Sequence, residues 1–327
     1  MRRFQQQRVC MVRQPPSSDR AYCSALARQD QAALCGTAVQ VDLWLLIEYP
    51  RPWKPKAVED NELDPRINAH LAALPEQVRA HSGARLRVQF IKQAASADMV
   101  QPKVLVSQGQ AQQQHLWSGQ LTQYSDLLNL TASDLASNQP LQMLPGAERL
   151  DEPLYLVCTN GQRDVCCARF GLPVFEQLQT HVGRRVWQTT HVGGHRYAPN
   201  LLSLPSGLLY GFVTPEDVVA LTQAQDDGQI SLPNLRGRSC YAPAAQASEY
   251  YLRQHLGETD MHALTLTDIG GDNSVTAAEF KLAADGVARV RVEQLEGTPV
   301  VASCDGKPKP VTEFRLTDLH INGERVV

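Results

Sequence analysis

The chain has 327 residues, of which 43% are hydrophobic and 20% are charged, and its formal net charge is −3. This composition is typical of a globular protein with about two domains and a sizeable core. Acidic and basic residues are mixed along the chain, so the charge pattern gives no reason to expect binding to nucleic acid or to an anionic membrane.

Residues 1–22 are expected to form an N-terminal arm. They include basic residues but no continuous apolar segment, so they do not resemble a secretory signal peptide. The longest apolar stretch, 39–49, is interrupted by Asp42 and is too short to span a membrane. We therefore expect a cytoplasmic protein without a membrane partner, whose eight cysteines do not form a disulfide framework.

Residues 23–147 are predicted to form a first thioredoxin-like domain with the element order β-α-β-β-β-α. The expected elements are a strand at 39–49, a helix at 63–81, a strand at 84–93, a hairpin from 102–108 and 114–122, and a helix that starts at 124–130. The helix is expected to be disturbed at Pro75. Cys23 and Cys35 precede the first strand, and the domain has no metal-ligand pattern, so we expect it to act as a scaffold or docking surface.

Residues 148–237 are predicted to repeat this order in a second thioredoxin-like domain. The expected elements are a strand at 152–158, a polar loop, a helix at 171–183, a strand at 184–190, a Gly-rich loop at 191–200, a hairpin at 201–213 and a helix at 214–225. Pro173 is expected in the first turn of the first helix, and Thr214 is expected to cap the second. The predicted fold class is therefore α/β, with tandem thioredoxin-like domains.

Residues 238–327 are predicted to form a C-terminal extension that is mainly β. Residues 242–257 have helical spacing, and the segments 287–295 and 298–304 are expected to be two strands that pair with each other.

Two cysteines and two histidines of the second domain form a candidate ligand set. Cys158 ends a predicted strand, and Cys167 follows across a loop; His191 ends the next strand, and His195 follows after two glycines. Loops that leave neighbouring parallel strands lie at the same edge of a sheet, so we expect the four side chains to meet. Thiolate and imidazole ligands suit zinc or an iron–sulfur cluster, and the eight-residue gap between the cysteines weakly disfavours zinc.

The motifs "CTNGQRDVCC", "HVGGHRYAPN" and "YGFVTPEDV" resemble the sucrase/ferredoxin-like family of thioredoxin-like [2Fe–2S] ferredoxins. The resemblance is strongest over 151–222, and "CSALARQDQAALCGTAVQVDLWLLIEYPRPW" is similar to the start of that family. It implies a [2Fe–2S] cluster bound by two cysteines and two histidines, here Cys158, Cys167, His191 and His195. Asn160 stands where the family commonly has a histidine.

The residues around these four are expected to support the site. Arg163 and Asp164, between the cysteines, are expected either to brace the loop or to form a solvated pair. Tyr197 and Asn200 are further candidates for contacts beyond the ligands. Cys166 is an extra thiol beside Cys167, and we favour a position in the loop over a role as substitute ligand.

The function that follows from this resemblance is one-electron transfer, and an electron carrier is favoured over an enzyme with its own substrate. No G-x-G-x-x-G follows a predicted strand, so we expect a separate protein as reductase or other redox partner. The sequence leaves the oligomeric state open.

Three other functions remain open from the residues themselves. The same four ligands could hold a structural Zn²⁺ in an interaction module. The cysteines could serve a thiol–disulfide oxidoreductase, although no C-x-x-C is present. The first half could bind a protein partner as a scaffold.

Overall fold

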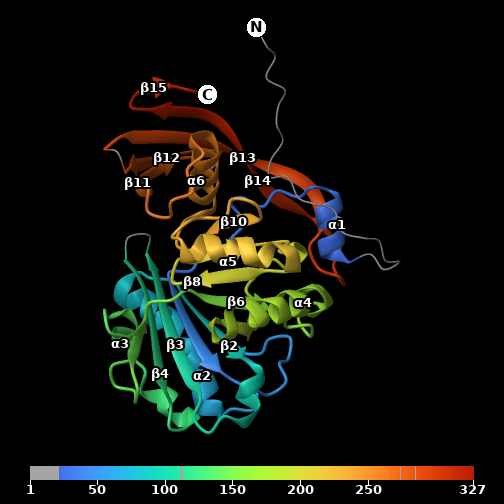
Figure 1. Ribbon diagram of the computed structural model, residues 1–327, viewed down its shortest axis with the longest axis vertical. Helices are drawn as coiled ribbons and strands as arrows, with labels where there is room; N and C mark the ends of the chain where they lie inside the picture. The colour runs from blue at the N-terminus through green and yellow to red at the C-terminus, as the bar shows by residue number, and fades with distance from the viewer. Residues whose placement is uncertain (1–21, 111–112, 273, 284) are drawn as a thin grey trace.

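A computed structural model describes residues 22–327 apart from 111–112, 273 and 284. The strands form two sheets, one of ten strands and one of five, and helices pack against both (Figure 1). This architecture confirms the predicted α/β class. Residues 1–21 of the expected N-terminal arm lie outside the described residues.

The first half folds as a β-α-β unit followed by a hairpin. Its elements are β1 (Leu43–Glu48), α2 (Pro65–Ser82), β2 (Leu86–Lys92), the 3-10 helix η1 (Ala94–Asp98), β3 (Lys103–Gln110), β4 (Gln113–Gln120), η2 (Tyr124–Asn129), α3 (Ala132–Ala136) and β5 (Glu148–Leu150). The apolar β1 is buried along its whole length, as a central strand must be. Asp64 starts α2 by accepting a hydrogen bond from the Arg66 backbone N–H, and Gly83 ends it in a left-handed conformation.

The second half repeats this order. Its elements are β6 (Leu154–Cys158), α4 (Val165–Val182), η3 (Gly183–Arg185), β7 (Val186–Thr189), η4 (His195–Tyr197), β8 (Leu201–Leu204), β9 (Leu208–Tyr210), η5 (Pro215–Asp217), α5 (Val218–Asp226) and β10 (Leu235–Arg238). Thr214 and Asp217 form a capping box at the start of η5, where the sequence predicted a cap.

Strand pairing is the same in the two halves. β1 pairs in parallel with β2 and antiparallel with β3, and β6 pairs in parallel with β7 and antiparallel with β8. Each half continues outward through two further antiparallel pairs, β3–β4–β5 and β8–β9–β10. The repeated pairing is the structural counterpart of the repeated element order that the sequence predicts.

The two halves share one continuous sheet. The strand order is β10-β9-β8-β6-β7-β2-β1-β3-β4-β5, with an antiparallel join in which Ile91 pairs with Thr189 and Lys92 with Gln188. The domain boundaries expected at 147–148 and 237–238 remain predictions. Helix α1 (Cys23–Gln29), which those boundaries assign to the first half, packs against η4 of the second half, and Arg28 donates a hydrogen bond to the Phe212 carbonyl.

Three helices differ from their predicted form. Helix α2 continues through Pro75, where the sequence predicts a disturbance. Helix α4 continues through Pro173, which the sequence places in the first turn. The helix expected from residue 124 is divided into η2 and α3, each with its own capping box. Among the described helices, none is both long and apolar enough to cross a membrane.

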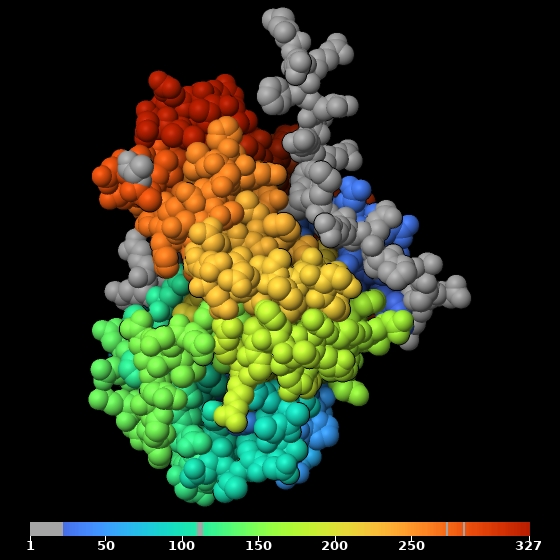
Figure 2. All heavy atoms as spheres, viewed as in Figure 1, coloured from blue at the N-terminus to red at the C-terminus, as the bar shows by residue number. Residues whose placement is uncertain are grey.

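The C-terminal extension has its own antiparallel sheet. The extension begins with the helix α6 (Pro243–Leu256). Its five strands pair in chain order and are β11 (Leu264–Gly271), β12 (Val275–Leu282), β13 (Val287–Val301), β14 (Pro308–Ile321) and β15 (Glu324–Arg325). This sheet occupies the top of the molecule in Figure 2, above the second half, and the first half lies at the bottom.

The expectation that 287–295 and 298–304 pair with each other is wrong. Residues 287–301 form the single strand β13, which pairs with β12 on one side and with β14 on the other. A register shift between Gly297 and Val300 accommodates Pro299 within the strand, as a β-bulge does. Beyond Glu293, β13 no longer pairs with β12 and continues as a two-stranded ribbon with β14, and β13 contacts α1 (Figure 1).

A buried ion network attaches this extension to the large sheet. Glu249 of α6 accepts hydrogen bonds from Arg238 of β10, at 3.1 Å, and from Arg253, at 2.9 Å, and all three side chains are at most 3% exposed. Both arginines also donate to the Met261 carbonyl in the segment that leads into β11. One carboxylate thus compensates two buried cations.

Replacing this carboxylate tests the network. We expect Glu249→Gln to lower the free energy of unfolding by about 3–5 kcal/mol, because two guanidinium groups would remain buried without a counter-charge. Urea denaturation of the full chain measures the change.

Glu62→Gln is the matched control, because Glu62 pairs with Arg51 at 2.8 Å with both side chains at least 60% exposed. We expect that variant to change stability by less than about 1 kcal/mol. Equal losses in the two variants would contradict a special role for Glu249.

Candidate metal centre

Parallel pairing of β6 with β7 positions the first cysteine and the first histidine. In this register Cys158, the last residue of β6, lies beside Thr189, the last residue of β7. His191 follows two residues later, so both side chains lie at the same edge of the sheet, as the sequence predicted.

Helix α4 brings the second cysteine to this edge. The helix begins at Val165, so Cys166 and Cys167 lie in its first turn and not in the loop expected before residue 171. Asp164 caps the helix by accepting a hydrogen bond from the Cys166 backbone N–H at 2.9 Å. Gly171 lets the helix cross β6 closely, because a β-carbon there would stand 2.4 Å from the Cys158 carbonyl oxygen.

Three of the four predicted ligands form one compact group. The ligand atoms of Cys158, Cys167 and His191 all lie within 4.8 Å of one another. His191 Nδ1 is 4.0 Å from each of the two sulfurs. Both cysteines are fully buried, whereas His191 is partly exposed.

His195 lies beside this group without belonging to it. Its ring centroid is 4.9 Å from that of His191, and its Nδ1 is a buried nitrogen with no hydrogen-bond partner among the described residues. Burial lowers the pKa of His195, and the nearby His191 acts in the same direction. The imidazole is therefore neutral near pH 7, which is the form that binds metals.

The cysteine pair is poised to supply a thiolate. A hydrogen bond with the Cys167 thiol lowers the pKa of Cys158, which burial alone would raise, and hydrogen bonds with His191 and the Val192 backbone act in the same direction. Metal ligation requires this deprotonated form.

Arg236 and Asn200 fix the histidine loop. Arg236 Nη1 donates to the Gly193 carbonyl at 3.0 Å and to Asn200 Oδ1 at 2.6 Å, and Asn200 Nδ2 donates to the Gly194 carbonyl at 3.0 Å. Gly194 has a φ of +71°, and a β-carbon there would stand 2.6 Å from Arg236 Nη2. Burial lowers the pKa of Arg236 to about 10, so it remains a cation at neutral pH.

The first half also contributes to the site. Arg87 and Gln89 on β2 both donate to the His191 carbonyl, at 2.7 and 3.2 Å. Sequence reasoning missed Arg87, Gln89 and Arg236. Only the pairing of β2 with β7 and of β9 with β10 brings them to the loop, and no local motif marks them.

The other predicted supporting residues differ in their burial and in what they contact. Asp164 is buried and lies 3.9 Å from His195 Nε2, whereas Arg163 is exposed, as in a solvated position. Tyr197 is buried and its ring lies 4.7 Å from the Arg236 guanidinium carbon. Cys166 is outside the compact group and contacts Cys23 and Cys304. Asn160 donates to the Lys54 carbonyl of the first half.

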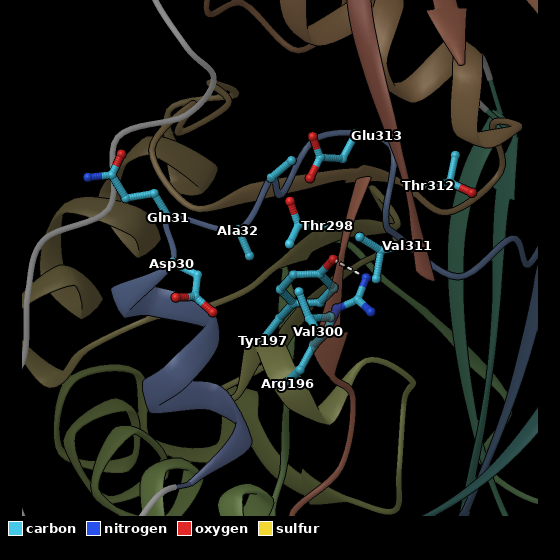
Figure 3. Close-up of a pocket in the computed structure, with 11 residues that line it drawn as sticks. Asp30, Gln31, Ala32, Arg196, Tyr197, Thr298, Val300, Val311, Thr312 and Glu313 are labelled. Carbon is cyan, nitrogen blue, oxygen red and sulfur yellow. Dashed lines mark hydrogen bonds between the residues drawn. The ribbon is translucent and has the colours of Figure 1, made fainter. Parts of the chain in front are cut away.

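The histidine side of the centre lies near the surface. An open hollow of about 460 Å³ is lined by residues that include His195, Gly194 and Arg236. A second cavity, of about 330 Å³, lies next to it between the end of α1, η4 and the β13–β14 strands, and there Arg196 donates a hydrogen bond to the Tyr197 hydroxyl (Figure 3). The cysteine side is sealed by the core, so access to the centre is from the histidines.

A sequence model of the family described as sucrase/ferredoxin-like matches residues 34–237, which is more than half of the chain and includes all four predicted ligands. The chain belongs to the sucrase/ferredoxin-like family.

Two curated relatives of this family member are yeast proteins named altered inheritance of mitochondria protein 32. The one from Meyerozyma guilliermondii is 38% identical over 82 residues, which cover 21% of this chain and 28% of the yeast protein. The one from Debaryomyces hansenii is 33% identical over 82 residues, which cover 22% of this chain and 30% of the yeast protein. The chain thus matches less than a third of either relative. No solved structure matches it significantly.

The contact of Gly171 with Cys158 leads to a test of the α4 crossing. Alanine would add about 1 kcal/mol of helix propensity, but its β-carbon would meet a backbone oxygen that cannot move aside. We expect Gly171→Ala to lower the free energy of unfolding by about 1–3 kcal/mol and to speed labelling of the Cys158 and Cys167 thiols.

Gly270→Ala is a suitable control, because nothing lies within 4 Å of the β-carbon it would add. That variant should leave both the stability and the thiol-labelling rate nearly unchanged. A stabilised Gly171→Ala protein would show that the helix can retreat from β6 without cost.

Proposed function

We propose that this protein is a one-electron carrier with a [2Fe–2S] cluster bound by Cys158, Cys167, His191 and His195. The observation that carries the proposal is the convergence of two buried thiols and two imidazoles at one edge of the sheet. The unpartnered, buried Nδ1 of His195 fits a ligand better than a structural histidine, because buried polar atoms without a partner are costly.

The donor set also fits this group chemically. Thiolates and neutral imidazoles are the ligands of [2Fe–2S] centres that combine cysteine with histidine. Because such a cluster has two irons, its four ligand atoms need not all lie within 4.8 Å of one another, as those of the compact group do. The position of His195 beside the compact group is consistent with this. When bound, the cluster supplies a centre that accepts and releases one electron.

The chain's own residues define the properties of such a centre. Cys158 and Cys167 lie in a core cluster with Trp44 and Leu156, which excludes water from the sulfur side. Imidazoles in place of two thiolates remove negative charge, so the potential lies above that of an all-cysteine cluster. Hydrogen bonds to the His191 carbonyl and to the loop around Gly194 keep the imidazoles in place.

The redox partner in this proposal is a separate protein that approaches from the histidine side. His195 lines the hollow at the surface, and its side chain is 16% exposed. None of the cysteines among the described residues forms a disulfide bond. In this proposal the protein works in the reducing cytoplasm.

A structural zinc site remains the second candidate, and one observation favours it. Cys158, Cys167 and His191 fit within 4.8 Å, which is compact enough for a single ion. A thiol–disulfide oxidoreductase is disfavoured, because Cys158, Cys166 and Cys167 are all 0% exposed and reactive cysteines need access.

Spectroscopy and elemental analysis of anaerobically isolated protein test the proposal. We expect a coloured protein with about two irons and two acid-labile sulfides per chain, which gives an electron paramagnetic resonance signal after reduction with dithionite. His195→Cys should keep the cluster and lower its reduction potential, since a thiolate adds negative charge. Cys158→Ser should lose iron.

His181→Cys is the matched control, since His181 lies exposed near the end of α4, outside the site. Its potential should equal that of the unmodified protein. A colourless protein with one zinc bound by these four residues would favour the second candidate, and the absence of both iron and sulfide would rule out the cluster.

A further inference from the structure

A second group of potential ligands lies on the other side of the α4 N-terminus. It consists of Cys23 from α1, Cys166 from α4, Cys304 from the β13–β14 connection, and the carboxylate of Asp164. Cys23 and Cys304 are 281 residues apart in the sequence, so their approach is a product of the fold and not of chain proximity. None of the four belongs to the proposed [2Fe–2S] ligand set.

The three sulfurs form a small triangle. The Sγ–Sγ distances are 3.5 Å for Cys23–Cys166, 3.2 Å for Cys166–Cys304 and 3.7 Å for Cys304–Cys23. These distances are far longer than a disulfide bond of about 2.05 Å. Tetrahedral zinc with Zn–S bonds of about 2.3 Å places its sulfurs about 3.8 Å apart, close to the longer two of these distances.

A carboxylate oxygen of Asp164 lies within 4.8 Å of all three sulfurs. Both of its carboxylate oxygens are 3.9 Å from Cys23 Sγ. The Cys304 backbone N–H donates to Oδ2 at 2.9 Å and the Cys166 backbone N–H donates to Oδ1 at 2.9 Å, so the carboxylate is held at both sides. Its side chain is only 2% exposed, and the Cys23 sulfur and His195 Nε2 each lie 3.9 Å from a carboxylate oxygen.

From this geometry we propose that Cys23, Cys166, Cys304 and Asp164 bind one zinc ion that joins α1, α4 and the β13–β14 connection. Three thiolates and one carboxylate complete the four-coordinate set of a closed structural site. A divalent cation also offsets the negative charge that three thiolates and a carboxylate would otherwise bring together in a buried place.

A single ion fits better than a second iron–sulfur cluster. Cysteines that ligate different irons of a cluster are spread around it, whereas here all three sulfurs lie within 3.7 Å of one another. Thiolate-rich tetrahedral sets of this kind select zinc among the common divalent ions.

The surroundings suit a structural role. Tyr22, Ala198, Phe170 and Val301 pack around the cysteines in one apolar cluster. Cys304 lies between the end of β13 and the start of β14, and β13 contacts α1. A metal at this point would tie the β13–β14 connection to α1 and α4.

Metal analysis of the full-length protein, purified anaerobically without chelator or polyhistidine tag, tests the site. We expect about one zinc per chain in addition to any iron. Cys304→Ser and Cys23→Ser should retain zinc at least about tenfold more weakly in competition with a chelator. Cys240→Ser removes a thiol elsewhere and should behave like the unmodified protein, and Cys158→Ser should keep its zinc.

Zinc X-ray absorption of the unmodified protein gives a second readout that needs no variant. A first shell dominated by three sulfurs is expected, whereas two sulfurs with two nitrogens would place the ion at Cys158, Cys167 and the histidines and overturn the site. Absence of zinc, or zinc that survives Cys304→Ser but not Cys158→Ser, would also overturn it. Iron and sulfide measured in the same samples report separately on the proposed cluster.

Discussion

The parallel pairing of β6 and β7 is the constraint on which the centre depends. With Cys158 level with Thr189, the residues that follow both strands emerge at one edge of the sheet. A register shift of one residue would turn Cys158 to the opposite face, since side chains alternate along a strand. The buried apolar side chains of β6 on both faces make such a shift costly, so the hydrophobic core sets the position of the ligands.

A second constraint is the closeness of α4 to this strand end. The helix carries Cys167 toward Cys158 and Cys166 toward Cys23, because adjacent residues in a helix point about 100° apart around its axis. One capping residue, Asp164, serves both groups: it starts the helix, contacts His195 and holds the Cys304 backbone. The two groups of potential metal ligands therefore lie next to each other at the start of α4 and share no cysteine.

Much of this arrangement could be predicted from the sequence, and the reasons for the rest are specific. The strand ends at Cys158 and before His191 follow from short apolar runs bounded by polar and Gly-rich segments. Pro173 is typical of the first turn of a helix and so places the helix start at 171, six residues after the true start, although Asp164 is itself a capping signal. The positions of Arg87 and Arg236 depend on pairing between strands distant in the sequence. The continuity of β13 depends on a bulge at Gly297, which looks like a turn in the sequence.

The join between β2 and β7 has a consequence for the half that carries the centre. β7 is short, with four residues, and on its outer side it pairs only with β2 among the described strands. Without the first half, that side would present unsatisfied backbone amides and carbonyls next to the histidine loop, a surface that invites pairing with other chains. The first half thus protects an edge of the second, and it keeps the loop that carries His191 and His195 from being drawn into intermolecular sheets.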